Sequence, residues 1–175
     1  MKLYCFGESG NAYTAAITME LAGVKWEPIF VDFFKGEARS EEYKKINGMG
    51  EVPTLVTDEG VTLSQSGAIQ QFIVDKTGKL GGELDDKYET LRWVLWDNHK
   101  MSSQVGIQRF LMNFLPPDKR PKGAINFLSG RIQVALSVLD NALADRDWLV
   151  GNSISVADLS CCGYLFYDEP FGFNR

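Results

Sequence analysis

The stretch Gly50-Glu51-Val52-Pro53-Thr54-Leu55, followed along the chain by Gln65-Ser66-Gly67, decides how this sequence is interpreted. Proline removes a backbone donor and biases Val52 toward extended geometry. An X-Pro bond also adopts the cis form far more easily than any other peptide bond. The apolar run 54–56 that follows predicts a short strand.

A hairpin and a helix complete this element. Asp58-Glu59-Gly60 predicts a tight turn, and residues 61–63 predict the returning strand. A helix is expected to begin within residues 64–66, because apolar side chains then recur at helical spacing. These side chains are Ile69, Phe72 and Ile73. The predicted order is therefore strand, hairpin, strand, helix.

The two ends of this element suggest a ligand with a main chain and a carboxylate. Val52 in extended geometry can offer its N–H and C=O to a peptide-like ligand as an added strand. Gln65 and Ser66 stand at a helix N-terminus, where free N–H groups and the dipole favour an anion. A small acidic peptide suits both. The alternative is a hairpin packed on a helix with no ligand at all.

Composition sets broad limits. The 175 residues are 45% hydrophobic, enough for one large or two small globular domains. A net charge of −5 argues against nucleic acid and anionic membranes as partners. No apolar run predicts a membrane span, and no signal peptide is expected. Cys5, Cys161 and Cys162 have no metal or disulfide spacing, so a reducing cytoplasm is expected and no metal.

The first part of the chain alternates strands and helices. Residues 2–6 and 26–31 predict strands on either side of a helix that Gly23 ends, and Pro28 suggests an edge strand. This unit predicts a parallel pair. With a short polar helix over 40–46 and the hairpin element, the order is that of an α/β thioredoxin-like domain over residues 1–79.

The second part has almost no strand signal. After a glycine-rich linker, residues 80–86, an all-α domain is expected over 87–175. Long helices are predicted at about 88–114 and around 125–143. Ser155-Val156-Ala157-Asp158 resembles a capping box and starts a helix that is apolar all round and therefore buried, to about Phe166.

This combination resembles the soluble glutathione transferases, in both domains and over nearly the whole chain. In that family the residue before a cis proline pairs with the cysteinyl backbone of glutathione, and an acid- or amide-Ser pair holds the γ-glutamyl group. The resemblance gives these roles to Val52 beside Pro53, and to Gln65 and Ser66. Glutathione is thus implied as co-substrate.

The resemblance also indicates where the glutathione thiol is activated. The family places a donor to the sulfur in the loop between the first strand and first helix, which here holds Ser9 and Asn11, and Asn11 is expected to be that donor with Ser9 assisting. Such a donor lowers the pKa of the thiol. Asn11 is expected to cap the helix beginning at Ala12. The loop resembles bacterial nu-class transferases, with Ser9 in place of their threonine.

Two positions depart from the family pattern at the glycyl end of glutathione. A lysine commonly precedes the Val-Pro pair, and here it is Glu51. A glutamine often found before the second helix is Ala38. Arg39 or Lys35 are possible substitutes. Weaker glutathione affinity is therefore expected.

Other chemical side chains are assigned less central roles. Cys5 lies within a strand and is expected to be buried and inert, and His99 has no serine or cysteine partner in register. The second substrate should lie over the sulfur. Its proposed contacts are Phe6 in the first loop and Gln104, Gln108 and Phe110 on the long helix. For the three helix residues, an ordinary helix surface with no substrate is at least as good an interpretation.

The sequence therefore predicts a cytoplasmic detoxifying glutathione transferase, homodimeric as in its family, acting on an apolar electrophile or a disulfide. The alternatives are a glutathione-dependent disulfide reductase, or a non-catalytic binding module on the same fold. Family members usually continue beyond the last helix. An exposed apolar patch is therefore expected at the C-terminus. Its members are Phe166, Tyr167, Phe171 and Phe173.

Overall fold

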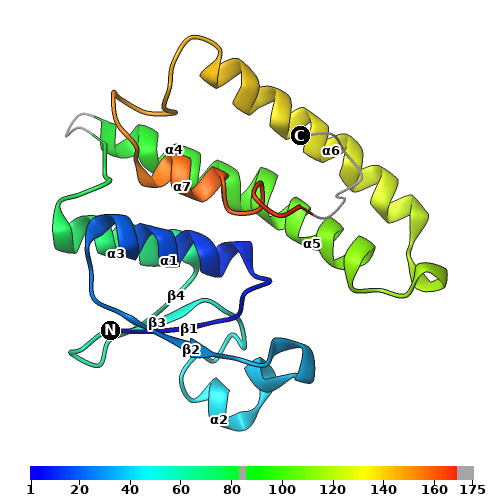
Figure 1. The fold of residues 1–175 in the computed structure, drawn as a ribbon, viewed down its shortest axis with the longest axis horizontal. Coiled ribbons are helices and arrows are strands. Elements are labelled where there is room, and N and C mark those ends of the chain that lie inside the picture. Colours follow the sequence, from blue (N-terminus) through cyan, green and yellow to red (C-terminus); the bar gives the residue numbers. More distant parts are fainter. Residues whose placement is uncertain (83–85, 169–175) are drawn as a thin grey trace. The chain divides into compact units, whose positions relative to one another are not determined.

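The computed structural model describes residues 1–82 and 86–168, and the chain divides into two compact units, 1–81 and 82–175 (Figure 1). Each unit has an apolar core of its own, as expected for a domain. Part of the expected linker, positions 83–85, lies outside the described residues.

The first unit is built on a mixed four-stranded sheet of order β2-β1-β3-β4. Strand β1 pairs in parallel with β2 and antiparallel with β3, and β3 pairs antiparallel with β4. The edge position that Pro28 predicts for β2 is confirmed. The elements are β1 (Lys2–Cys5), α1 (Gly10–Ala22), β2 (Glu27–Phe30), η1 (Phe33–Lys35), η2 (Glu37–Arg39), α2 (Glu41–Lys44), β3 (Thr54–Val56), β4 (Thr62–Ser64) and α3 (Ser66–Thr77).

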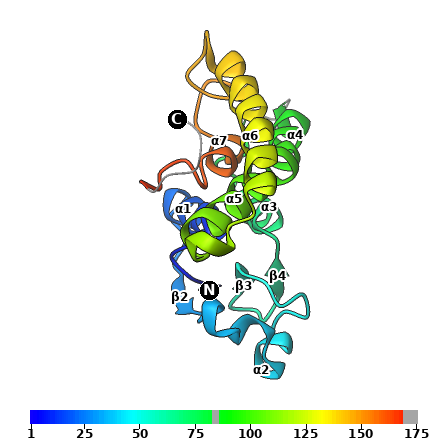
Figure 2. The same cartoon turned by 90° about the vertical axis from the view of Figure 1, so that its right-hand side faces the viewer.

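Helices α1 and α3 lie side by side on one face of this sheet, and α2 lies on the other (Figures 1 and 2). Alternate residues of β1 serve the two faces, as strand geometry requires. Leu3 points into the core under α1 and α3, whereas Tyr4 packs into a smaller cluster that includes Tyr43 and Val52. The thioredoxin-like fold predicted from the sequence is thus confirmed.

The hairpin turns where the sequence indicates. Gly60 has a φ of 81°, a left-handed conformation that favours glycine, and its N–H donates to the Thr57 C=O at 3.1 Å. Strand β4 begins at Thr62, one residue later than expected, and α3 begins at Ser66. This turn sets the distance along the chain between Val52 and Ser66.

The second unit contains helices and no strand among its described residues, as predicted. Its core joins Trp93, Met101, Ile132, Leu139 and Ala157. Its elements are α4 (Lys87–Trp96), η4 (Asp97–Met101), α5 (Ser102–Asn113), η5 (Pro117–Lys119), α6 (Lys122–Leu143) and α7 (Val156–Cys161). No helix in the described part of the chain combines the length and apolar character needed to cross a membrane.

Two helix predictions need correction. The helix expected over 88–114 contains a π-helical turn, η4, which begins at the buried Asp97, and the Asp97 carboxylate accepts the Ser102 hydroxyl just after this turn. Helix α7 starts at the capping box of Ser155 and Asp158 as predicted, but ends at Cys161 and not near Phe166. Phe166 is exposed and Tyr167 half-buried; Phe171 and Phe173 lie outside the described residues.

Candidate active site

The loop that leads into β3 is fixed through a single carbonyl group. Three side-chain donors reach the Glu51 C=O, at 2.9, 2.9 and 3.2 Å: Tyr43, Asn47 and Thr54. The Tyr43 and Thr54 hydroxyls also contact each other at 3.0 Å. All three donor side chains are buried, and a buried hydrogen bond is stronger because water does not compete for it. The main chain immediately before Val52 is therefore held firmly.

Val52 itself keeps its main-chain groups open. The Val52-Pro53 bond is cis, as the sequence suggested. Within residues 1–82 and 86–168, neither the N–H nor the C=O of Val52 takes part in a backbone hydrogen bond. Open groups next to a strand can pair with an extended ligand.

The N-terminus of α3 lies at the other end of the hairpin. Gln65 has φ 70° and ψ 119°, a conformation that non-glycine residues rarely adopt and that tends to occur at functional sites. Ser66 begins the helix and is buried. No side chain in the described residues caps α3, so no side-chain hydrogen bond satisfies the N–H groups of its first turn. Such a terminus accepts a carboxylate.

A hydrogen bond joins these two ends of the site. Gln65 Nε2 donates to Glu51 Oε2 at 3.1 Å, and it also approaches Met49 Sδ at 3.6 Å. Glu51 thus contacts both ends of the site: its main chain is bonded to that of Val52, and its carboxylate accepts the hydrogen bond from Gln65. The loop before β3 and the start of α3 are therefore linked by a side-chain hydrogen bond.

The two cations that could replace the missing lysine are placed differently. Lys35 pairs with Asp32 at 2.9 Å, and this partner raises the pKa of Lys35. Arg39 forms no ion pair among the described residues, and its side chain runs past Gly50. A Cβ on Gly50 would lie 3.8 Å from Arg39 Cγ. Arg39 is therefore the available cation beside the Glu51 loop.

The first loop places Ser9, not Asn11, at the cap of α1. Helix α1 begins at Gly10, and Ser9 Oγ accepts the Ala12 N–H at 3.1 Å. The expected cap by Asn11 is wrong because the helix starts before it, and Asn11 lies in the first turn. Since the Ser9 oxygen accepts the helix N–H, its hydroxyl proton remains available for another acceptor.

Phe6 belongs to an aromatic cluster that follows β1. Its ring stacks on Phe33 with centroids 4.9 Å apart and meets Phe34 edge-on at 5.7 Å. Phe34 is 52% exposed. The Phe6 C=O also accepts the Ser9 N–H at 3.1 Å. An apolar surface therefore lies directly next to the loop that carries Ser9.

The two glutamines proposed for the second substrate are engaged within the helical unit. Gln104 donates to the Lys100 C=O and accepts from Arg131 Nε, at 2.8 and 2.9 Å. Gln108 is fully buried and donates to Ser129 Oγ at 3.0 Å. Both amides therefore take part in packing between α5 and α6.

Burial disfavours thiolate chemistry at the cysteines of this chain. Burial raises the pKa of Cys5 and raises the pKa of Cys162 to about 11. The pKa of the buried Cys161 is raised further still. Across residues 1–82 and 86–168, no group of three acidic, histidine or cysteine side chains could hold a metal ion. The loop around Ser9 and the groups near Val52 and Ser66 are therefore the candidate site among the described residues.

Two parts of this arrangement were not predicted from the sequence. The hydrogen bonds from Tyr43 and Asn47 to the Glu51 C=O were not predicted, because contacts across a loop leave no spacing pattern in the sequence. Asp97 was also overlooked, although an acid on the core side of an apolar helix is a detectable signal.

Comparison with known proteins places this fold and site in a family. The model of the glutathione S-transferase N-terminal domain matches residues 1–75, and that of the C-terminal domain matches residues 104–174. The chain is 30% identical to glutathione S-transferase 2 of Schizosaccharomyces pombe, over 99% of this chain and 80% of that protein. The chain therefore belongs to the glutathione S-transferase family.

Other similar proteins carry different names. The disulfide-bond oxidoreductase YfcG of Escherichia coli is 28% identical, over 89% of this chain and 75% of its own. The crystal structure of glutathione transferase URE2P6 from Phanerochaete chrysosporium, in complex with oxidized glutathione, superposes with a TM-score of 0.85. It is 28% identical, over 94% of this chain and 77% of that one.

Proposed function

We propose that this protein is a glutathione transferase that binds glutathione on its first unit and activates the thiol for attack on an apolar electrophile. One observation carries the proposal: the open main chain of Val52 is joined, through Glu51 and Gln65, to the uncapped N-terminus of α3. A γ-glutamyl peptide presents a backbone and a carboxylate to these two groups. The URE2P6 structure, which holds oxidized glutathione, supports this assignment.

In this proposal each end of the ligand has its own residues. Val52 pairs with the cysteinyl main chain beside Pro53, and Gln65 and Ser66 bind the γ-glutamyl group. Arg39 takes the glycyl carboxylate, because it is the cation beside the Glu51 loop that has no carboxylate partner among the described residues. Arg39→Gln should weaken glutathione binding, whereas Lys35→Gln should leave it nearly unchanged.

The thiol is activated by the first loop. Ser9 Oγ–H donates to the glutathione sulfur while its oxygen keeps the Ala12 N–H, and Asn11 assists from the first turn of α1. A hydrogen bond to a charged sulfur lowers the pKa of the thiol, so more thiolate is present at neutral pH. The thiolate then attacks the electrophile, and Phe6 and Phe34 provide an apolar surface for it.

Substitutions in this loop test the mechanism. Ser9→Ala should raise the pKa of the bound thiol by about one to two, with at least a tenfold loss of turnover. Asn11→Ala should raise it less and keep glutathione affinity within several-fold. The readout is ultraviolet absorbance of the bound thiolate against pH. Because Ser9 also caps α1, Ser9→Thr is the matched control and should restore both values.

Binding itself is measured first, by calorimetric titration with reduced glutathione. One glutathione per chain is expected. No heat of binding from a protein whose circular dichroism shows it folded would refute the proposal. An unchanged thiol pKa in both Ser9→Ala and Asn11→Ala would instead refute only the activation mechanism.

Disulfide reduction is the second candidate, and the name of the similar protein YfcG favours it. The glutathione thiolate attacks one sulfur of a disulfide, forms a mixed disulfide and releases the other sulfur as a thiol. A second glutathione then releases the remaining thiol and leaves oxidized glutathione. Turnover of hydroxyethyl disulfide without conjugation of chlorodinitrobenzene would select this candidate. The nu-class resemblance of the first loop is in keeping with it and stays a prediction.

Assembly and location complete the proposal. We expect a homodimer, supported by large apolar side chains that α4 leaves exposed, Tyr88 and Leu95. Sedimentation equilibrium checks this, and a monomer at micromolar concentration would contradict it. A detoxifying activity that consumes reduced glutathione requires a reducing compartment, which is why the cytoplasm remains the proposed location.

A further inference from the structure

Met49 is the most exposed methionine of this chain. The sequence has five methionines, and all of them lie within the described residues. Met19 and Met101 are buried in the two apolar cores, and Met1 and Met112 are half-buried. Met49, by contrast, is 64% exposed. Exposure governs how readily a peroxide dissolved in water reaches a thioether, so Met49 is the methionine that is oxidised first.

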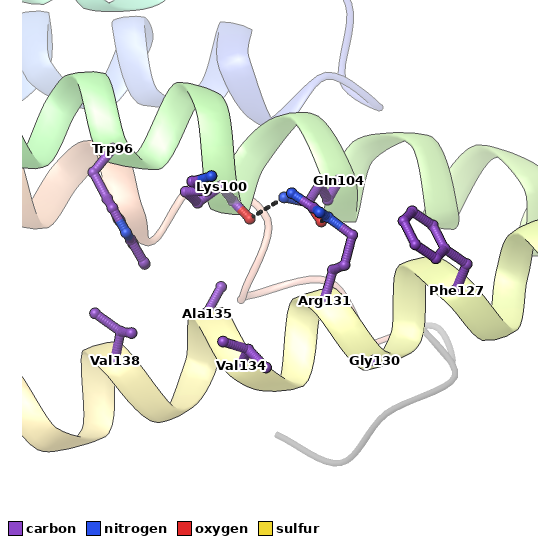
Figure 3. A pocket seen from close by; sticks show the side chains of 9 residues that line it. All are labelled: Trp96, Lys100, Gln104, Phe127, Gly130, Arg131, Val134, Ala135 and Val138. Atoms are coloured by element: carbon purple, nitrogen blue, oxygen red, sulfur yellow. Dashed lines mark hydrogen bonds between the residues drawn. The ribbon is translucent and has the colours of Figure 1, made fainter.

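The other sulfur atoms of the chain are less accessible to an oxidant. Burial raises the pKa of all three cysteines, so little thiolate is available for oxidation. The helical unit also has a groove of about 610 Å³ between α6 and the helix formed by α4, η4 and α5 (Figure 3). Its lining among the described residues includes neither a methionine nor a cysteine. A peroxide that enters this groove therefore finds no sulfur there.

The main chain on both sides of Met49 is fixed. The buried Asn47 side chain accepts the Met49 N–H at 3.1 Å and donates to the Glu51 C=O at 2.9 Å. Gly50 follows with a φ of 64°, and a Cβ there would lie 3.0 Å from the Ala38 carbonyl oxygen. The loop therefore holds Met49 in one place relative to the start of α3.

Two hydrogen-bond donors point at the Met49 sulfur. Ser64 Oγ and Gln65 Nε2 each lie 3.6 Å from Met49 Sδ. The Gln65 amide nitrogen carries two N–H groups, and it also donates to Glu51 Oε2 at 3.1 Å. A thioether is a weak acceptor, so the contact with sulfur leaves the second N–H of Gln65 nearly available to a ligand at the start of α3.

We propose that Met49 is a site of reversible oxidation by hydrogen peroxide, and that its oxidation weakens the binding of glutathione. A lone pair of the Met49 sulfur attacks one peroxide oxygen, the O–O bond breaks, and that oxygen stays on sulfur as a sulfoxide. Sulfur loses two electrons, and the peroxide takes them up and leaves as water. This inference rests on the proposed function, because it concerns regulation of the same glutathione site.

The new oxygen changes the hydrogen bonding at the start of α3. A sulfoxide is polar, and its oxygen is a far better acceptor than a thioether sulfur. It forms among the donors that already approach the sulfur, so it takes the Ser64 hydroxyl and the second N–H of Gln65. It also places partial negative charge beside the helix N-terminus that is assigned to the ligand carboxylate. Both changes disfavour glutathione.

Peptide mass spectrometry locates the oxidised residue. The full-length protein is treated with hydrogen peroxide, sampled over time and desalted. We expect the peptide that contains Met49 to gain one oxygen several times faster than those of Met1 and Met112, while the three cysteines stay unmodified.

Calorimetric titration with reduced glutathione then measures the consequence. The chain oxidised at Met49 should bind glutathione about tenfold more weakly than the untreated chain. Methionine sulfoxide reductases for both stereoisomers should restore the affinity. Met49→Leu is the matched control, because leucine has a similar volume and no sulfur. Peroxide should leave the glutathione affinity of this variant where it was before treatment.

Three results would overturn this inference while the proposed function stands. The first is oxidation of Met1 or Met112 before Met49. The second is unchanged glutathione affinity in a chain that is oxidised at Met49. The third is an equal loss of affinity in peroxide-treated Met49→Leu, which would place the cause at another residue. If the untreated, folded chain binds no glutathione, the proposed function fails and this inference fails with it, so the two failures are distinguishable.

Discussion

Replacing Asp97 by asparagine removes a buried negative charge from the helical unit. Asp97 is 2% exposed. Its carboxylate accepts the Ser102 hydroxyl at 2.8 and 3.0 Å and the Ser160 hydroxyl at 2.6 Å. These bonds tie the π-helical turn η4 to α7. Asparagine has nearly the same shape and retains an acceptor for one of the hydroxyls, so the substitution mainly removes the charge.

The expected magnitude comes from the pKa of this carboxyl. Burial raises the pKa of Asp97 from its ordinary 3.8 to about 6, while the two serine hydroxyls partly oppose the rise. Because the folded state favours the protonated form, stability is greatest below the unfolded pKa and is lost as pH rises through the folded pKa. The difference corresponds to about 3 kcal/mol, lost between about pH 4 and pH 6. Asp97→Asn cannot show this loss.

The assay compares urea unfolding of the two proteins from pH 4 to pH 7.5. Tryptophan fluorescence reports mainly on the helical unit, which holds Trp93, Trp96 and Trp148. Dilute protein is needed near pH 4.9, the isoelectric point. The stability of Asp97→Asn relative to the native chain should increase by about 3 kcal/mol over this range.

Parallel pH curves for the two proteins would refute this account of Asp97. Glu89→Gln is the matched control, because Glu89 is partly exposed and its hydrogen bonds from Arg92 lower its pKa. Its contribution is present at neutral pH and is lost as pH falls, so removing Glu89 should change the pH curve in the opposite direction. A control that behaves like Asp97→Asn would show that net charge causes the effect.

Three further substitutions test the rest of the molecule. Ser66→Ala should weaken glutathione binding by about 1–3 kcal/mol, and unchanged calorimetric affinity would contradict a carboxylate site at α3. Phe34→Ala should raise the KM for an aromatic electrophile while unfolding stability stays within about 0.5 kcal/mol. An unchanged KM would exclude Phe34 from the second-substrate surface. Asp158→Ala breaks the capping box and the bond from the Leu149 N–H, so stability should fall by about 2 kcal/mol in urea unfolding. A loss below about 0.5 kcal/mol would contradict that role.

Local signals in the sequence predicted most of the fold. The hairpin at Gly60, the edge position of Pro28 and the capping box at Ser155 each depend on residues close together in the chain. Their spacing is therefore visible in the sequence. The cis bond at Val52-Pro53 was likewise suggested by residue type alone. The order of such elements predicted a thioredoxin-like unit followed by a helical one, and the family resemblance implied the glutathione transferase architecture.

Boundaries and partners were predicted less well. Asn11 was expected to cap α1, but the helix begins at Gly10 and Ser9 is the cap. Both residues can cap a helix, so residue type alone did not fix the first residue of α1. The sequence also left open whether Lys35 or Arg39 could replace the missing lysine at the glycyl end of glutathione. In the structure Lys35 forms an ion pair with Asp32, so Arg39 is the one of these two cations without a carboxylate partner among the described residues.

By itself, the sequence determined the order of strands and helices, the proline and helix-terminus pair that indicate a peptide site, and the family. Only the tertiary structure showed that Asp97 meets Ser160, that Gln104 orients Arg131, and that Tyr43 holds the Glu51 carbonyl. Those contacts join separate elements. Which side chains meet there depends on how whole helices and loops pack, and packing leaves no fixed spacing in the sequence.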